Sequence, residues 1–118
     1  MDSDEVSTQD IQLPSSEDFI AVFGCDYAIQ DEMFQKYEFE DECGGTAKLT
    51  FGFVDGSFGL SIFQESTEVL KIYDEYLSVA LINEADQSIS ITLQQGRTAQ
   101  TIKFKPWPRM AVSIENMR

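Results

Sequence analysis

Apolar and polar residues alternate in short runs from residue 36 to the end of the chain, and this period of two limits the possible folds most strongly. Successive side chains of a β-strand point to opposite faces, so such runs predict half-buried strands. In segment 88–94, for example, Ile89, Ile91 and Leu93 share one face. Eight predicted strands follow from this pattern: 36–42, 47–54, 57–64, 69–73, 76–82, 88–94, 98–105 and 110–114.

Turn residues separate these runs and favour antiparallel pairing. Asp55-Gly56 is a strong hairpin signal, and Gln95-Gly96 marks another turn. Parallel pairing needs long crossover connections, and no segment between the runs is long enough to supply one. The sequence therefore predicts a mainly β fold, either an antiparallel sandwich or a partly closed, strongly bent sheet. Its 118 residues suit a single domain, 1–118.

The N-terminal third follows a different pattern. Segment 14–24 has residues that typically begin and end a short helix, with Ser15 or Ser16 as the N-cap and Gly24 as the end. Segment 25–35 fits neither period, which predicts a loop or irregular turn. Residues 1–13 are polar, and we expect a flexible tail there.

Charge is the most unusual property of the composition. The chain has 21 acids, eight bases and no histidine, for a net charge of −13. Residues 1–45 hold thirteen of the acids and one base, Lys36. Such a field repels nucleic acid and anionic membranes and speeds encounters with cationic partners. A general bias toward soluble, acidic surfaces would give the same total.

Several kinds of chemistry are missing from the sequence. Without histidine the chain lacks the usual general base and His metal ligands, and it has no phosphate-binding glycine motif. Cys25 and Cys43 are predicted to be buried free thiols, paired only in an oxidising compartment. Two-carboxylate chemistry would need acids in a cleft, one of them with a raised pKa. We therefore expect no enzyme activity, no metal and no cofactor.

The candidate binding site is the acidic and aromatic stretch before residue 45. Alternating acids on one strand face would project together, and interleaved aromatic side chains could anchor a contact with a cationic cleft. The alternative is that Phe34, Tyr37 and Phe39 belong to the core and the acids form an ordinary solvated face. The predicted partner-binding residues are Asp26, Tyr27, Asp31, Glu32, Tyr37, Glu38, Glu40, Asp41 and Glu42.

With its small size, acidic charge, β patterning and runs such as Tyr37-Glu38-Phe39-Glu40, the chain resembles bacterial immunity proteins of toxin–immunity systems, including contact-dependent inhibition. The resemblance implies a dedicated basic toxin bound 1:1, often a nuclease, with an RNase preferred. The acidic start, Met1-Asp2-Ser3-Asp4-Glu5, lacks an apolar stretch, so a cytoplasmic location is expected.

Two other functions remain open from the sequence. The nine Phe could line a cup for a small hydrophobic ligand, which predicts a pocket of several hundred cubic ångströms. An exposed sheet edge could instead pair with a second copy in a structural subunit. Trp107, between two prolines, is predicted to be a lid on the end of the sandwich or an exposed anchor.

Overall fold

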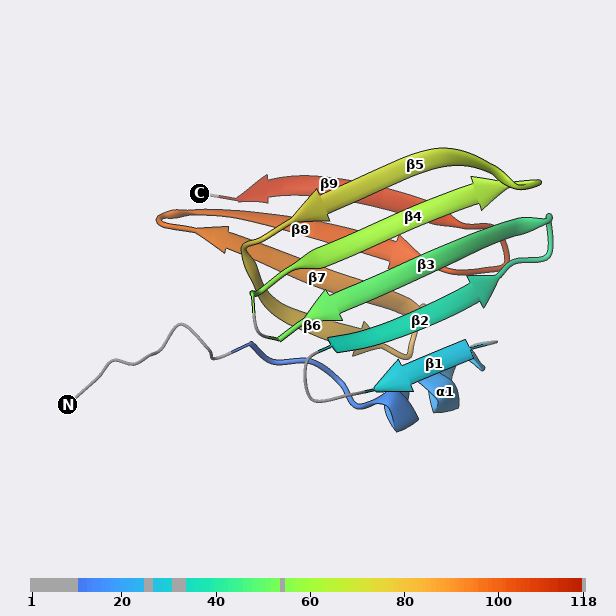
Figure 1. The fold of residues 1–118 in the computed structure, drawn as a ribbon, viewed down its shortest axis with the longest axis horizontal. Coiled ribbons are helices and arrows are strands. Elements are labelled where there is room, and N and C mark those ends of the chain that lie inside the picture. The colour runs from blue at the N-terminus through green and yellow to red at the C-terminus, as the bar shows by residue number, and fades with distance from the viewer. Residues whose placement is uncertain (1–10, 25–26, 31–33, 54, 118) are drawn as a thin grey trace.

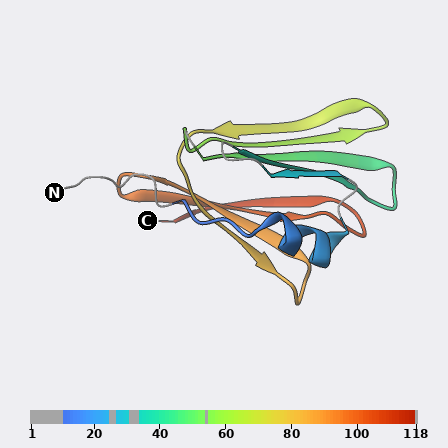
Figure 2. The ribbon, with the colours of Figure 1, turned by 60° about the horizontal axis from the view of Figure 1, so that its bottom comes forward.

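Two antiparallel sheets face one another in the computed structural model, which describes residues 11–24, 27–30, 34–53 and 55–117 (Figures 1 and 2). One sheet has the order β1-β2-β3-β4-β5 and the other β6-β7-β8-β9. Among the described residues, no helix has the length and apolar character needed to cross a membrane. The elements in chain order are α1 (Ser16–Phe23), β1 (Tyr27–Gln30), β2 (Phe34–Glu40), β3 (Gly45–Gly52), β4 (Phe58–Gln64), β5 (Thr67–Asp74), β6 (Leu77–Asn83), β7 (Ser88–Gln95), β8 (Thr98–Lys105) and β9 (Ala111–Met117).

The predicted antiparallel sandwich is confirmed, and each strand pairs with its neighbour in the chain. The exception is the short connection between β5 and β6, which carries the chain from one sheet to the other (Figure 2). Asp55-Gly56 forms the turn between β3 and β4, and Gly56 has a φ of 65°, a conformation that favours glycine. The described residues contain one strand more than the eight that the alternation predicts.

The additional strand corrects the prediction of a loop over residues 25–35. Tyr27–Gln30 forms β1, which pairs antiparallel with β2 at Gln35 to Glu38, and β2 itself begins at Phe34. Residues 25, 26 and 31–33 lie outside the described residues. A strand as short as β1 depends on pairing with its neighbour more than on its own periodicity, and so its sequence gives a weak signal.

The predicted N-terminal helix is confirmed at both ends. Ser15 is the N-cap of α1: its hydroxyl accepts a hydrogen bond from the Asp18 N–H, while the Asp18 carboxylate accepts one from the Ser15 N–H. Gly24 ends the helix with a φ of 59°, and its N–H donates to the Ile20 carbonyl. Figure 2 shows α1 beside the two sheets, near their β1 and β6 edges.

Aromatic side chains from α1 and both sheets make the centre of the core. Phe19 stacks on Tyr37 with 4.1 Å between ring centroids, and Phe23 meets Phe39 edge-on at 5.8 Å. Phe39 in turn contacts Phe104 of the second sheet at 5.7 Å. These five residues are at most 1% exposed. The helix is therefore part of the core that joins the two sheets.

Trp107 closes this core at the β8–β9 loop. Its ring lies 6.2 Å from that of Phe23, and its indole N–H donates to the side-chain oxygen of Gln87 at 3.0 Å. The indole is partly buried against the core cluster. This arrangement matches the predicted lid rather than an exposed anchor.

Replacing Phe19 by alanine should lower the free energy of unfolding by about 3–5 kcal/mol, because it leaves a cavity beside Tyr37 and removes the stacked ring. Urea unfolding followed by circular dichroism measures this change. The neighbouring Ile20 is 49% exposed on the same helix. Ile20→Ala should change stability by less than about 0.5 kcal/mol, and equal losses in the two variants would contradict the assigned helix orientation.

Candidate partner-binding surfaces

The predicted acidic stretch is divided among several environments. Tyr37 is fully buried in the core and donates its hydroxyl to Gln35, so it offers no surface to a partner. Its role in the core is the alternative that the sequence left open. Glu38 and Glu40 lie on the outer face of β2, whereas Asp41 and Glu42 follow in the turn to β3. Tyr27 begins β1; Asp26, Asp31 and Glu32 lie outside the described residues.

The outer face of the five-stranded sheet is of mixed charge. Glu38 lies opposite Lys48 of β3, and the same row continues through Ser61 to Lys71 of β5. The Lys48 ammonium also lies 5.7 Å from the centre of the Phe63 ring. Lys36 and Glu40 flank Glu38 on the same face, because they are two residues away along the strand. Carboxylates on this face are thus interleaved with ammonium groups instead of forming a row of one sign.

Asp41 is engaged in holding the fold together. One carboxylate oxygen accepts hydrogen bonds from the N–H groups of Cys43 (2.8 Å) and Gly45 (2.7 Å), and the other accepts from Met110 (3.0 Å). Partial burial by itself raises the pKa of Asp41, but these donors and the charge of Arg109 together hold its pKa below the ordinary value. The Glu42 N–H also donates to the Pro108 carbonyl. The β2–β3 turn is thereby tied to the β8–β9 loop of the other sheet.

Cys43 corrects a prediction. Its thiol is free and the residue is exposed at the β2–β3 turn, whereas the sequence analysis expected buried thiols. The physical reason is the turn itself, in which Asp41 binds the backbone and directs residues 42–44 outward. Cys25 lies outside the described residues.

A second acidic and aromatic surface lies at the opposite end of the molecule, where the β3–β4 and β5–β6 connections meet (left in Figure 1). The hydroxyl of Tyr73 donates to Glu75 at 3.1 Å, and the Tyr76 N–H donates to Asp74 at 2.8 Å. Tyr73 and Tyr76 are 60% and 46% exposed. The hydrogen bond from Tyr73 to Glu75, partial desolvation, and the charges of Glu75 and Asp55 raise the Tyr73 pKa. We call Asp55, Tyr73, Asp74, Glu75 and Tyr76 the tyrosine–acid cluster.

The sequence analysis missed this cluster, although a signal was present. Tyr73-Asp74-Glu75-Tyr76 has the same acid and aromatic composition as Tyr37-Glu38-Phe39-Glu40. The acids interrupt two apolar runs, so the alternation by itself indicates only a break between the predicted strands 69–73 and 76–82. The contribution of Asp55 depends on the fold, since Gly56 accepts a hydrogen bond from the Leu77 N–H and so brings the two connections together.

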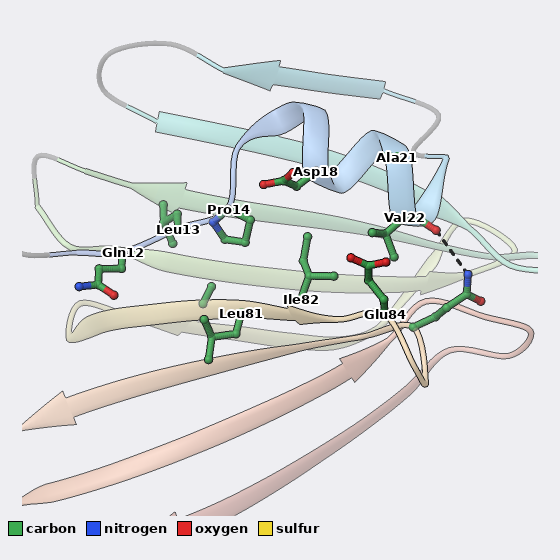
Figure 3. A pocket seen from close by; sticks show the side chains of 11 residues that line it. Gln12, Leu13, Pro14, Asp18, Ala21, Val22, Leu81, Ile82 and Glu84 are labelled. Atoms are coloured by element: carbon green, nitrogen blue, oxygen red, sulfur yellow. Dashed lines mark hydrogen bonds between the residues drawn. The ribbon is translucent and has the colours of Figure 1, made fainter.

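A groove of about 690 Å³ runs between α1 and β6, and Figure 3 shows it from close by. Gln87, one of the lining residues, donates its side-chain amide to the Val22 carbonyl at 3.4 Å, and a dashed line marks this bond in Figure 3. The lining includes no Phe, because six of the Phe residues fill the core between the sheets. It therefore differs from the Phe-lined cup expected of a hydrophobic-ligand protein. The lining residues are Gln12, Leu13, Pro14, Asp18, Ala21, Val22, Ala80, Leu81, Ile82, Glu84 and Gln87.

The charged side chains of these surfaces do not assemble into a metal centre. Within the described ranges, no three His, Cys, Asp or Glu residues lie together in a way that could hold a metal ion. The arrangement offers exposed carboxylates, tyrosine hydroxyls and an open groove, all of which suit recognition of another molecule.

Comparison with known proteins establishes a likeness of fold. No family model matches the sequence, and no curated protein matches it. Among solved structures, it is similar to a chain of the contact-dependent growth inhibition toxin–immunity protein complex from Klebsiella pneumoniae 342, with a TM-score of 0.75. The match covers 92% of this chain and 98% of that chain, at 13% sequence identity. At this identity, the likeness shows that the two chains share a fold over nearly their whole lengths.

Asp41→Asn should lower the free energy of unfolding by roughly 1 kcal/mol at pH 7, because a neutral amide accepts the three N–H groups less strongly. The folded-state pKa of Asp41 is lowered, so its contribution is present above the unfolded pKa of about 3.9 and disappears as the pH falls through the folded value. The difference between wild type and variant should therefore shrink below about pH 4.

Urea unfolding at pH 7 and pH 3 tests this dependence on Asp41. The exposed neighbour Glu42 supplies a control, since Glu42→Gln changes the charge by the same amount and keeps the turn. A constant difference between Asp41→Asn and wild type at both pH values would contradict the assigned role of the carboxylate.

Proposed function

We propose that this chain is an immunity protein that binds a cationic toxin and neutralises it. The observation that carries the proposal is the shared fold, over 92% of this chain and 98% of the other, with a chain of a toxin–immunity complex. That complex pairs two kinds of protein, and the net charge of −13 and the absence of histidine favour the inhibitory one. A toxin that cleaves a polyanion needs a cationic cleft, which this sequence does not supply.

The proposed mechanism is electrostatic exclusion of the toxin's substrate. The described residues hold fourteen of the 21 acids and seven of the eight bases, so their net charge is −7. Carboxylates that enter a basic cleft take the place of phosphates and speed the encounter. The partner that fits this chemistry best is a nuclease, with an RNase preferred, bound 1:1 in the cytoplasm.

Two acidic surfaces could make this contact. The first is the exposed part of the predicted set, Glu40 and Glu42, together with the partly exposed Glu38. Asp26, Asp31 and Glu32, which lie outside the described residues, remain candidates from the sequence alone. The second is the tyrosine–acid cluster at the other end. We propose Glu38, Glu40 and Glu42, the accessible part of the predicted set, as the contact, and reversing the charge at either surface separates the two.

The partner is sought in the protein encoded beside this chain's gene. Expression of the C-terminal region of that protein should arrest growth, and co-expression of this chain should restore it. Failure to protect cells from that growth arrest, with both proteins present at comparable levels, would overturn the proposed function.

Glu40→Lys combined with Glu42→Lys should slow association with the toxin by roughly tenfold at low salt, because it removes steering charge from the contact. Stopped-flow measurements at two salt concentrations give the rate and its salt dependence. The control combines Glu75→Lys with Glu115→Lys, which changes the net charge equally at other positions.

Equal slowing by both pairs of substitutions would indicate an effect of net charge alone and would contradict a local contact at Glu40 and Glu42. Slowing by the Glu75→Lys pair alone would assign the contact to the tyrosine–acid cluster. Thermal melting of each variant provides the check that both remain folded.

A further inference from the structure

Strand β6 is an edge strand of the four-stranded sheet, and only part of its outward edge is covered. Its inner edge pairs with β7. On the outward edge Gln12 forms a parallel bridge with Val79: the Gln12 N–H donates to the Ser78 carbonyl at 3.1 Å, and the Ala80 N–H donates to the Gln12 carbonyl at 2.9 Å. The chain then leaves the edge, because Pro14 has no N–H and Ser15 begins the helix.

The backbone beyond this bridge points into the groove between α1 and β6. In a strand, residues whose N–H and C=O face one neighbour alternate with residues whose groups face the other. The Ala80 N–H faces Gln12, so the Ala80 carbonyl and both backbone groups of Ile82 also face outward, away from β7. Among the described residues, no backbone hydrogen bond from another segment covers these three groups.

Apolar side chains and carboxylates surround this open stretch of edge. Figure 3 shows Ile82 directed toward α1, with Val22 and Glu84 near it and Leu81 directed to the other side of the strand. Leu81 is 61% exposed at the rim. The lining contains two acids, Asp18 and Glu84, and no lysine or arginine. Nearby Lys103 is already paired with Asp86 at 2.7 Å.

The acidic lining of the groove determines which kind of segment can bind there favourably. The chain's own first ten residues carry four acids and no base, and a second copy would bring another net charge of −13. Both would meet an acid-lined groove with like charge, which is unfavourable. An extended segment with alternating apolar and basic residues would instead place its cations beside Asp18 and Glu84.

We propose that the open edge of β6 receives an extended, basic strand of the partner protein, which continues the hydrogen bonding that Gln12 begins. Backbone bonds to Ala80 and Ile82 would supply affinity, and the alternate side chains would supply specificity. This inference rests on the proposed function for the identity of the partner, but its binding chemistry can be tested without it.

The probe is a ten-residue peptide of alternating valine and lysine, blocked at both ends. A peptide with five valines followed by five lysines has the same charge and composition, and serves as the control. Hydrogen exchange followed by NMR should show that the alternating peptide slows exchange of the Ile82 amide by roughly fivefold or more, while the control peptide does not.

Two variants locate the contact. Ile82→Pro removes an outward N–H that the fold does not use, and it should abolish binding of the alternating peptide; edge strands tolerate proline at such positions. Glu84→Lys should weaken binding roughly two- to fivefold, whereas Glu115→Lys, with the same change of net charge, should weaken it less. If Ile82→Pro does not fold, hydrogen exchange of the Ile82 amide in the wild-type chain still shows whether the alternating peptide binds the edge of β6.

Unchanged exchange at Ile82 with the alternating peptide would overturn the inference, as would equal protection by the control peptide. A dimer in size-exclusion chromatography with a protected Ile82 amide would assign the edge to a second copy and overturn the proposed occupant. In the toxin complex, an unprotected Ile82 amide would overturn this inference and leave the proposed function standing, whereas absence of a complex would count against the proposed function alone.

Discussion

The packing of one short helix against two sheets is the contact on which the rest of this structure depends. Phe19 and Phe23 of α1 reach Tyr37 and Phe39 of one sheet, and Phe39 reaches Phe104 of the other. Aromatic pairs of this kind contribute about 0.5–1.5 kcal/mol each beyond the burial of their area. Because the helix closes the side of the sandwich, it also forms one wall of the groove beside β6. The same helix that completes the core therefore also shapes this groove.

Charge is distributed more evenly than its position in the sequence suggests. Glu38 lies in register with Lys48, and Asp41 binds backbone N–H groups between the two sheets. Sheet pairing brings bases from later strands beside acids from β2, so an acidic stretch of sequence becomes a mixed face. Conversely, Asp55 and Glu75 are distant in sequence and meet at one end of the fold. The surface charge pattern of this chain thus depends on the topology as much as on the total charge.

The strands could be predicted well because each half-buried strand has its own alternation of apolar and polar residues. The helix could be predicted equally well, since Ser15 and Gly24 are local signals at its two ends. Features that depend on pairing between segments could not be predicted in this way. β1 lacks an alternating pattern of its own, and the exposure of Cys43 follows from the turn around Asp41. For the site, Tyr37 shows the limit most clearly. Its aromatic ring and its acidic neighbours fit a binding surface, and its full burial and its stacking on Phe19 assign it to the core.

The single tryptophan gives the molecule a built-in optical reporter. Trp107 donates to Gln87, which lines the groove and itself donates to Val22 of the helix. Indole emission responds to the polarity and hydrogen bonding of its surroundings, and this indole donates directly to a residue that lines the groove. With one such residue in the chain, a change in intrinsic fluorescence can be attributed to this corner of the sandwich without any label.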